Sequence, residues 1–513
     1  MFTNFINSKH TARKRIFLGS PEAEAESADN SAIPLNKVYE DYHGIAQALS
    51  AEKFIVLGRK GSGKSAFATF FHNLSKNNAT LHCRIIKKSD VNLEKIIQLG
   101  KSVDANVDSE SFFKWIIYTN FLELFSKIST INNSREYDDL RKFLEKNRGY
   151  IAVTEFEIKD LVTKHGFSVS IEYFKRFLTS KINKKIEFKS ERAPYYKLIP
   201  HLEDLIKKVL SSQDCKSNEN FFSLFFDDLD VDFDLNEENN ITNLMALIRS
   251  CRHINNTIFR DNDIDARVIL FIRDDVANNL INAKLADSAK IFTSYSARID
   301  WYDEKYSGRK EDENELALKK FINQRIAYFF ESAGLEYNKE DPWSSFALPC
   351  PDYTSSFKYI VNQTLFRPRD LLLYFLPLQN SMHHLPIDFN KIKNLSKSYA
   401  SELGKEIRNE LSAKYSIHEV ESLLKVLGRM SSQPQSQKFV LDNISELLPQ
   451  RVAQEVLNEL FTLSLIGVVK NQSMYFFKCR ETEEKKSNLM IEEKDELVVQ
   501  YGMQTYLHSN KIK

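Results

Sequence analysis

The feature that most constrains this chain is a glycine-rich octapeptide, Gly58-Arg59-Lys60-Gly61-Ser62-Gly63-Lys64-Ser65. Its spacing, G-x-x-x-x-G-K-S, is typical of a loop whose backbone N–H groups surround nucleotide phosphates. The glycines are needed because a side chain at those positions would block the phosphates. The sequence therefore predicts a phosphate-binding loop (P-loop). The alternative is a chance match in a glycine-containing turn.

The residues on either side of the octapeptide supply the context that a P-loop requires. Residues 53–57 (KFIVL) form an apolar strand, and apolar residues then recur at helical spacing from Phe67 to Leu74. A helix that starts here directs its positive N-terminus at an anion. We therefore expect Mg-ATP binding, with Lys64 at the β and γ phosphates and Ser65 as a Mg²⁺ ligand. The predicted nucleotide-binding residues of this loop are Gly58, Arg59, Lys60, Gly61, Ser62, Gly63, Lys64, Ser65 and Ala66.

A second apolar strand ends in carboxylates and follows the P-loop unit in the chain. Residues 221–226 (FFSLFF) are followed by Asp227, Asp228, Leu229 and Asp230. A strand of this kind places a carboxylate beside the P-loop, so Asp227 is the predicted second Mg²⁺ ligand. Asp228 is the predicted catalytic carboxylate that orients the attacking water, and it is one methylene shorter than the usual glutamate. Hydrolysis is therefore expected to be slow. The alternative is an acidic turn that only ends the strand.

Three arginines are candidates for contact with nucleotide phosphates. Arg273 ends the next apolar strand, where it either senses the γ-phosphate as a catalytic residue or pairs with its acidic neighbours. Arg367 and Arg369 flank Pro368 at a helix start, where the helix dipole disfavours cations. They are predicted to bind nucleotide from a lid. The alternative is a pair of surface arginines neutralised by Asp370.

Length and composition indicate a globular protein of several domains. The chain has 513 residues, 42% of them hydrophobic, and a formal net charge of +1, so no overall field favours nucleic acid or an anionic membrane. Its scattered cysteines and the lack of a long apolar run predict a cytoplasmic protein without membrane contact. The predicted fold is α/β, with a parallel P-loop sheet of the additional-strand type. The predicted ranges are a leader (1–36), the ATPase domain (37–305) with a helical insertion (about 90–215), a helical lid (306–400), a winged-helix domain (401–480) and a charged tail (481–513).

The predicted winged-helix domain has a third helix that is a poor match for DNA. This helix, at about 449–463, carries Arg451 but also Glu455 and Glu459. Helices that read DNA usually present several Lys or Arg side chains. Contact with a protein partner or nucleotide-dependent packing is therefore favoured, although a basic stretch in the insertion keeps nucleic-acid binding open.

Taken in order, the octapeptide, the Asp227-Asp228-Leu229-Asp230 strand end, Arg273-Asp274-Asp275 and Arg367-Pro368-Arg369-Asp370 resemble a bacterial group of P-loop ATPases. This group is akin to the AAA+/STAND branch, near the origin-recognition-type and KAP ATPases. Its members often carry a leader with an acidic A-E-x-E run, which Ala23-Glu24-Ala25-Glu26 matches. The resemblance implies an oligomerising ATPase or nucleotide-dependent switch, often encoded beside an effector and in some relatives linked to defence against phage.

Three functions remain as hypotheses from the sequence. The first is an ATPase switch that regulates a protein partner or effector, with a homo-oligomer expected. The second is a nucleic-acid-binding initiator or loader. The third is a scaffold that binds ATP without turnover, consistent with Asp228 in place of a glutamate.

Overall fold

The computed structural model describes residues 14–28, 30–87, 108–151, 168–182, 190–212, 215, 219–229, 238–283, 287–303, 306, 310–351, 355–412, 414–431, 433–470, 474–481 and 483–512. The chain divides into two compact units. The sheet unit comprises residues 43–59 and 64–299, and the C-terminal unit comprises residues 1–42, 60–63 and 300–513. The octapeptide therefore contributes residues to both.

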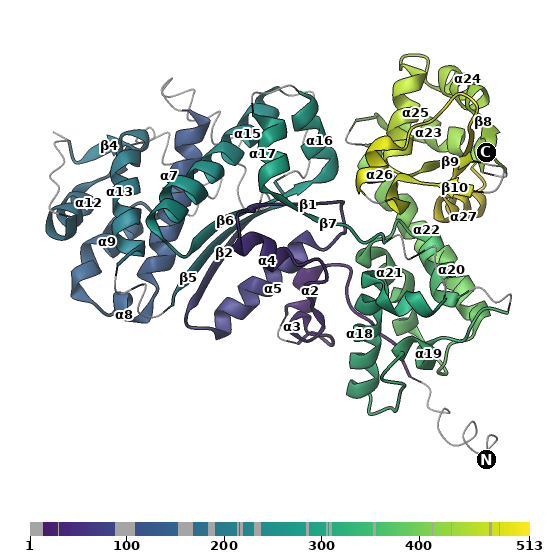
Figure 1. Cartoon of the computed structure of the whole chain (residues 1–513), viewed down its shortest axis with the longest axis horizontal. Coiled ribbons are helices and arrows are strands. Elements are labelled where there is room, and N and C mark those ends of the chain that lie inside the picture. Colours follow the sequence, from purple (N-terminus) through teal and green to yellow (C-terminus); the bar gives the residue numbers. More distant parts are fainter. Residues whose placement is uncertain are drawn as a thin grey trace. The chain divides into compact units, whose positions relative to one another are not determined.

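A parallel sheet of five strands forms the centre of the sheet unit (Figure 1). Strand β6 lies between β1, which leads into the octapeptide, and β5, which ends at Asp227. This additional strand confirms the predicted α/β fold. In sheet order the strands are β2 (Leu81–Lys87), β5 (Phe221–Asp227), β6 (Ala266–Arg273), β1 (Ile55–Gly58) and β7 (Ser296–Ile299).

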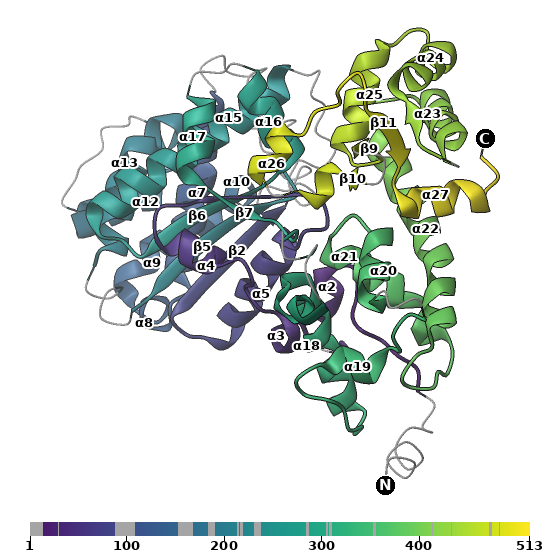
Figure 2. The ribbon, with the colours of Figure 1, turned by 45° about the vertical axis from the view of Figure 1, so that its right-hand side comes forward.

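The three central strands β5, β6 and β1 are mainly apolar and buried, because helices cover both faces of the sheet (Figure 2). On one face, Phe225 of β5 and Phe271 of β6 stack with ring centroids 5.8 Å apart. Phe67 of helix α5 (Lys64–Asn77) packs edge-on against Phe225 on the same face. Leu224 points the other way and belongs to the buried cluster that contains helix α7 (Ser109–Ser126).

The described part of the insertion is built around α7. Most residues of this helix are buried, because α9 (Asp138–Lys146), α13 (Ile199–Leu210) and α15 (Glu238–His253) pack around it. The neighbouring elements are α8 (Ser129–Asn132), α9 (Asp138–Lys146), α10 (Arg148–Ile151), β3 (Ser168–Ser170), α12 (Glu172–Phe177), β4 (Arg192–Pro194) and α13 (Ile199–Leu210). The sheet unit is completed by α4 (Ile45–Ser50), α15 (Glu238–His253), α16 (Asp274–Asn282) and α17 (Ser288–Tyr295).

The C-terminal unit begins with a helical part in which α22 is the longest helix. Its helices are α18 (Ala317–Ser332), α19 (Pro342–Phe346), α20 (Ser356–Gln363), α21 (Pro368–Phe375) and α22 (Phe389–Leu411). The leader supplies α2 (Ala23–Glu26) and α3 (Leu35–Val38) and exchanges backbone hydrogen bonds between Lys14 and His383. Ile16 and Leu18 lie within the core of this unit. The leader therefore packs onto a later part of the chain, and the apolar residues it buries belong to that shared core.

The described residues of the predicted winged-helix domain (401–480) form helices and a hairpin, and the hairpin belongs to a larger sheet. The elements are α23 (Ile417–Met430), β8 (Gln435–Ser436), α24 (Gln437–Leu447), α25 (Ala453–Thr462), β9 (Ile466–Lys470) and β10 (Met474–Phe476). They are followed by α26 (Glu483–Asn488), β11 (Glu496–Val499) and α27 (Tyr501–Ser509). Strand β11 pairs antiparallel with β8 and β9 inside the sheet order β10-β9-β11-β8. Residues 481–513, expected to form a charged tail, thus supply an inner strand. The finer domain ranges stay predictions, because the chain resolves into two units.

Among the described helices, none combines the length and the apolarity needed to cross a membrane.

A buried ion pair fixes the leader to α18. Arg325 Nη1 and Nη2 donate to Glu26 Oε1 and Oε2 at 2.6 and 2.8 Å, and the two residues are only 3% and 2% exposed. Arg325 also donates to the Leu18 carbonyl at 3.1 Å, and the Ser20 amide donates to Glu26 Oε1 at 2.7 Å. Gly19 has a φ of +122°, and a Cβ there would stand 2.0 Å from Arg325 Nη1. The last residue of the A-E-x-E run is therefore structural.

We predict that Glu26→Ala lowers the free energy of unfolding by about 3–5 kcal/mol, because it leaves the Arg325 guanidinium buried without its counter-charge. Urea denaturation followed by circular dichroism measures this change. Glu22→Ala removes an exposed carboxylate directly before the run and should change stability by less than about 0.5 kcal/mol. Equal losses in the two variants would contradict the assignment.

Candidate functional site

The octapeptide runs from the end of β1 to the first turn of α5. Gly61 and Gly63 have φ angles of +76° and +102°, in the left-handed region that only glycine adopts readily. Lys64 Nζ donates to the carbonyls of Gly58 and Arg59 at 2.7 and 3.2 Å. The ammonium group of Lys64 therefore lies over the loop, where an anion held by the loop would meet it.

Asp227 has the environment of a metal ligand. It is 1% exposed, and its Oδ2 has no hydrogen-bond partner among the described residues. Burial and the charge of Asp228 raise its pKa from 3.8 to about 6, against the opposing effects of the Ser65 hydroxyl and Lys64. A buried carboxylate without a full set of partners is costly, and a cation would relieve that cost.

The donor set around Asp227 fits Mg²⁺. Magnesium prefers hard oxygen ligands and takes few of them from the protein. The Asp227 carboxylate and the Ser65 hydroxyl supply two such oxygens, and they lie within hydrogen-bonding contact of each other. The orphaned Oδ2 is the observation that supports the fit.

Asp228 is held in an uncommon backbone conformation. Its φ is +55°, in the left-handed region, whereas Asp227 before it still belongs to β5. The turn at Asp228 therefore departs from the strand direction directly after Asp227. Backbone outliers of this kind are costly and concentrate at functional sites. Asp230, the last carboxylate of the predicted group, lies outside the described residues.

Arg273 is placed beside the P-loop strand but is paired with a neighbour. In the register of the sheet Arg273 lies opposite Gly58. Its Nε and Nη2 donate to the two carboxylate oxygens of Asp275 at 3.0 and 2.5 Å. The structure thus contains the neighbour pairing that was one of the two expectations, and a phosphate-sensing role stays a prediction.

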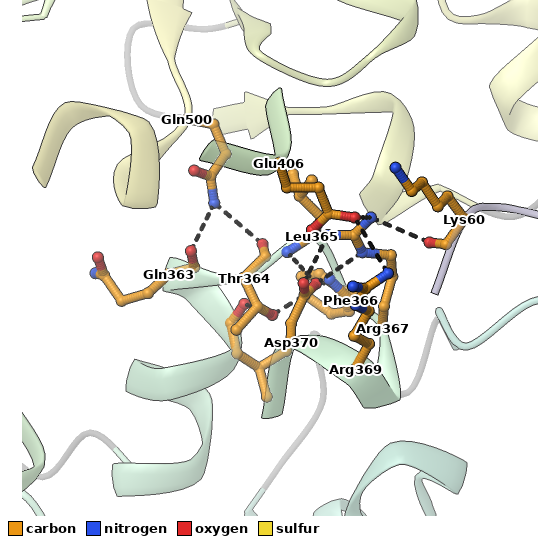
Figure 3. Close-up of polar contacts among 11 residues, drawn as sticks. Lys60, Gln363, Thr364, Leu365, Phe366, Arg367, Arg369, Asp370, Glu406 and Gln500 are labelled. Atoms are coloured by element: carbon orange, nitrogen blue, oxygen red, sulfur yellow. Dashed lines mark hydrogen bonds and ion pairs between the residues drawn. The ribbon is translucent and has the colours of Figure 1, made fainter. Parts of the chain in front are cut away.

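Arg367 is buried and saturated with acceptors (Figure 3). Its Nε and Nη2 donate to Asp370 at 3.0 and 2.7 Å, Nη1 and Nη2 donate to Glu406 at 3.4 and 3.1 Å, and Nη1 also donates to the Lys60 carbonyl at 3.0 Å. These bonds match the five N–H donors of a guanidinium. The alternative of a surface arginine is therefore wrong for Arg367, which is 3% exposed.

The charges around Arg367 reinforce one another. Burial alone would lower the pKa of Arg367, but the carboxylates of Asp370 and Glu406 raise it well above its usual range. Burial alone would raise the pKa of Glu406, but Arg367, Arg369 and Lys60 lower it. Arg367 and Glu406 are therefore both ionised at neutral pH, and Arg367 contacts the P-loop through the backbone carbonyl of Lys60.

Arg369 is the arginine with capacity left for a ligand. Its side chain is 30% exposed and lies 3.9 Å from Glu406 Oε1. Its Nε is buried and makes no hydrogen bond within the described part of the chain. A Cβ on Gly61 would stand 3.1 Å from both Cβ and Cδ of Arg369, so this side chain crosses the P-loop at its glycine. Nucleotide binding by Arg369 stays a prediction that this placement favours.

Two further residues of the site were missed from the sequence. Glu406 is one of several carboxylates on a long helix, and no local pattern distinguishes it. Trp301 Nε1 donates to the Ser62 carbonyl at 2.7 Å. The Ser62 hydroxyl is itself buried without a hydrogen-bond partner in the described structure. A tryptophan that follows the last strand of the sheet carries no motif, so only the structure assigns it to the loop.

Helix α25 presents few cations on its exposed face. Gln454, Glu455 and Asn458 are exposed, and Arg451 before the helix is paired with Glu419 at 2.7 Å. This agrees with the expectation that the helix is a poor match for a phosphate backbone.

Comparisons with known proteins give one family match. Residues 316–408 match a family model described as a FunZ-associated C-terminal helical domain. This range holds Arg367, Arg369, Asp370 and Glu406. No curated protein matches the chain.

Two solved structures show a weak likeness to the chain. The crystal structure of Cdc6p from Pyrobaculum aerophilum has 12% sequence identity and a TM-score of 0.27, over 96% of this chain and 99% of that chain. The structure of Drosophila ORC bound to DNA has 9% identity and a TM-score of 0.20, over 93% of each chain. Likenesses at these TM-scores support no argument. The class of the protein, a P-loop α/β fold of the additional-strand type, rests on the strand order and the octapeptide.

We predict that Asp227→Asn stabilises the protein without metal or nucleotide at neutral and alkaline pH. The pKa of Asp227 is higher in the folded chain than in the unfolded chain, so its ionisation destabilises the fold as the pH rises from about 4 to about 6. Above that window the asparagine variant should gain up to about 3 kcal/mol in the free energy of unfolding. Urea denaturation at pH 5 and pH 8 measures the difference, with Asp265→Asn, an exposed change, as the control. A variant that is less stable than the wild type at pH 8 would contradict the burial argument.

Proposed function

We propose that the chain binds Mg-ATP at the octapeptide and hydrolyses it slowly, as a nucleotide-dependent switch. The observation that carries this proposal is the buried carboxylate of Asp227, which has an unpartnered oxygen and lies in contact with Ser65 of the P-loop. A cation would neutralise the carboxylate of Asp227. The loop with its left-handed glycines, together with the ammonium group of Lys64, would bind an anion. Mg-ATP supplies both.

Each side chain has a defined task in binding. Lys64 exchanges the carbonyls of Gly58 and Arg59 for the β and γ phosphates. Ser65 and Asp227 hold Mg²⁺, which when bound neutralises charge on the phosphates. Because the proton and the metal compete for Asp227, Mg²⁺ affinity falls as the pH drops through about 6.

Asp228 orients the water that attacks the γ-phosphate. Its position directly after Asp227 and its left-handed backbone turn it away from the strand. An aspartate reaches one methylene less far than a glutamate, and small misplacements of a catalytic group cost rate. We therefore propose slow turnover, which suits a switch better than a motor.

The regulatory part of the proposal concerns Arg369 and the C-terminal unit. Arg369 crosses the P-loop at Gly61 and retains an unused donor. The presence or absence of a γ-phosphate would change the contacts of Arg369. Because Arg369 belongs to the C-terminal unit, the conformation of that unit would change as well. By analogy with the AAA+/STAND-like group, we propose a cytoplasmic homo-oligomer that acts on a protein effector, in the setting of antiviral defence. The match to a FunZ-associated domain is consistent with a multidomain chain of this kind.

We predict that Lys64→Ala weakens ATP binding at least about 100-fold, because it removes the charge-assisted bonds to the phosphates. Isothermal titration calorimetry with Mg-ATP measures the affinity. Lys76→Ala removes an exposed lysine from the last turn of the same helix and should bind ATP as the wild type does. Unchanged affinity in Lys64→Ala would sink the proposal.

We predict that Asp228→Asn keeps ATP affinity within about threefold but lowers phosphate release by about 100-fold or more, the usual scale for loss of a general base. The amide is isosteric and tolerates the left-handed backbone, so the turn is preserved. Single-turnover hydrolysis of radiolabelled ATP separates this step from binding. Equal hydrolysis in the wild type and the variant would remove Asp228 from the mechanism, and hydrolysis no faster than in Lys64→Ala would indicate a scaffold without turnover.

A further inference from the structure

The segment after the hairpin reaches back to the loop that precedes Arg367. Gln500, which is fully buried between β11 and α27, donates from Nε2 to the carbonyls of Gln363 and Thr364, each at 3.0 Å (Figure 3). Its Oε1 accepts from the Met503 amide at 3.0 Å and so caps α27. A single side chain therefore ties the start of α27 to the end of α20.

Helix α27 packs closely against both the end of α20 and helix α22. A Cβ on Gly502 would stand 2.3 Å from the Gln363 carbonyl, so only glycine allows this approach. A Cβ on Gly404 would stand 2.3 Å from the ring of Tyr506, and Gly404 lies on α22 two residues before Glu406. Helix α27 thus contacts both the loop that leads to Arg367 and the helix that carries its partner Glu406.

Arg480 makes a second contact with the same loop. Its Nη2 donates to the Asn362 carbonyl at 2.7 Å, and its guanidinium lies 5.4 Å from the ring centroid of Phe366. Phe366 has a φ of +59°, an outlier for a bulky residue, and its ring also packs on Tyr302 and Tyr306. Arg480 therefore helps to hold a strained residue directly before Arg367.

The loop between α20 and Arg367 is connected to the P-loop by further hydrogen bonds. The Leu365 amide donates to Asp370 Oδ2 at 3.0 Å, the same oxygen that accepts from Arg367 Nε. Arg367 in turn holds the Lys60 carbonyl, and Arg369 crosses Gly61. A series of hydrogen bonds, linked by the backbone of residues 363–370, thus leads from Gln500 to the octapeptide.

From this series we infer that Gln500 and Arg480 are positioning residues, through which Arg480 and the segment 496–507 set the affinity of the P-loop for ATP. The inference rests on the proposed function. Because such coupling is reciprocal, a partner that binds this segment would change ATP affinity, and ATP would change partner affinity by the same factor. Binding of a partner at β11 and α27 would then change the nucleotide site, although the partner does not touch the nucleotide.

The test is the affinity of the full chain for a fluorescent ATP analogue in the presence of Mg²⁺. Gln500→Glu keeps the shape and the acceptor for Met503 but replaces the donor with a carboxylate that faces two carbonyls. It is expected to weaken binding about tenfold or more. Gln504→Glu is the matched control: Gln504 donates to Val499 within its own segment, and its variant should bind like the wild type. Thermal unfolding midpoints show whether either variant is broadly destabilised.

A double mutant separates positioning from general damage. If Gln500 acts through the arginines, Gln500→Glu in an Arg369→Ala background should cost much less than it does alone. Arg480→Met is the second, independent variant and should also weaken binding, including in the case that Gln500→Glu does not fold. Wild-type affinity in Gln500→Glu or in Arg480→Met, fully additive losses with Arg369→Ala, or equal losses in Gln504→Glu would each overturn the inference. A wild type that binds no ATP would instead refute the proposed function itself.

Discussion

The buried guanidinium of Arg367 is the interaction on which the site most depends. It joins the start of α21 to α22 through Glu406 and to the P-loop through the Lys60 carbonyl. Burying such a charge is favourable only when every donor is satisfied, and here all of them are. Arg367 therefore fixes one position for the helix N-terminus that carries Arg369. The cost of placing two cations at that N-terminus is met by Asp370 and Glu406 rather than by solvent.

Much of the sheet could be predicted from the sequence, because its information is local. Residues 53–57, 221–226 and 267–272 are apolar runs of strand length, and a parallel sheet covered on both faces needs such runs. The octapeptide fixes where β1 ends, and the carboxylates fix where β5 ends. The order of the strands is not local, since it depends on β6 lying between the other two. The strand order was expected only because the predicted class of fold was a P-loop sheet of the additional-strand type.

The parts that escaped prediction depend on residues far apart in the chain. Asp370 was expected as a partner of Arg367 because it lies only three residues away in the sequence. The contacts of Arg367 with Glu406 and with the Lys60 carbonyl were not expected, because both residues are distant in the sequence. With Asp370 as its one expected partner, Arg367 could be taken for a surface arginine. The charged stretch that begins at residue 480 also contains three apolar residues, Leu497, Val498 and Val499. This run is too short to predict an inner strand from the sequence. Charge dominates the composition of this stretch, whereas three apolar residues and Gln500 determine its place.

Asp227 and Lys64, which both belong to the sheet unit, carry charges of opposite sign, and this difference constrains the ligand. Asp227 has a buried oxygen without a partner in the described chain, and Lys64 donates to the neutral carbonyls of Gly58 and Arg59. A lone anion would satisfy Lys64 but would repel Asp227, and a lone cation would do the reverse. A metal-bound polyphosphate satisfies both because it presents positive and negative charge together. The same argument explains why Lys64 rests on the loop carbonyls of Gly58 and Arg59: a cation that must later meet phosphate is kept on neutral acceptors rather than committed to Asp227.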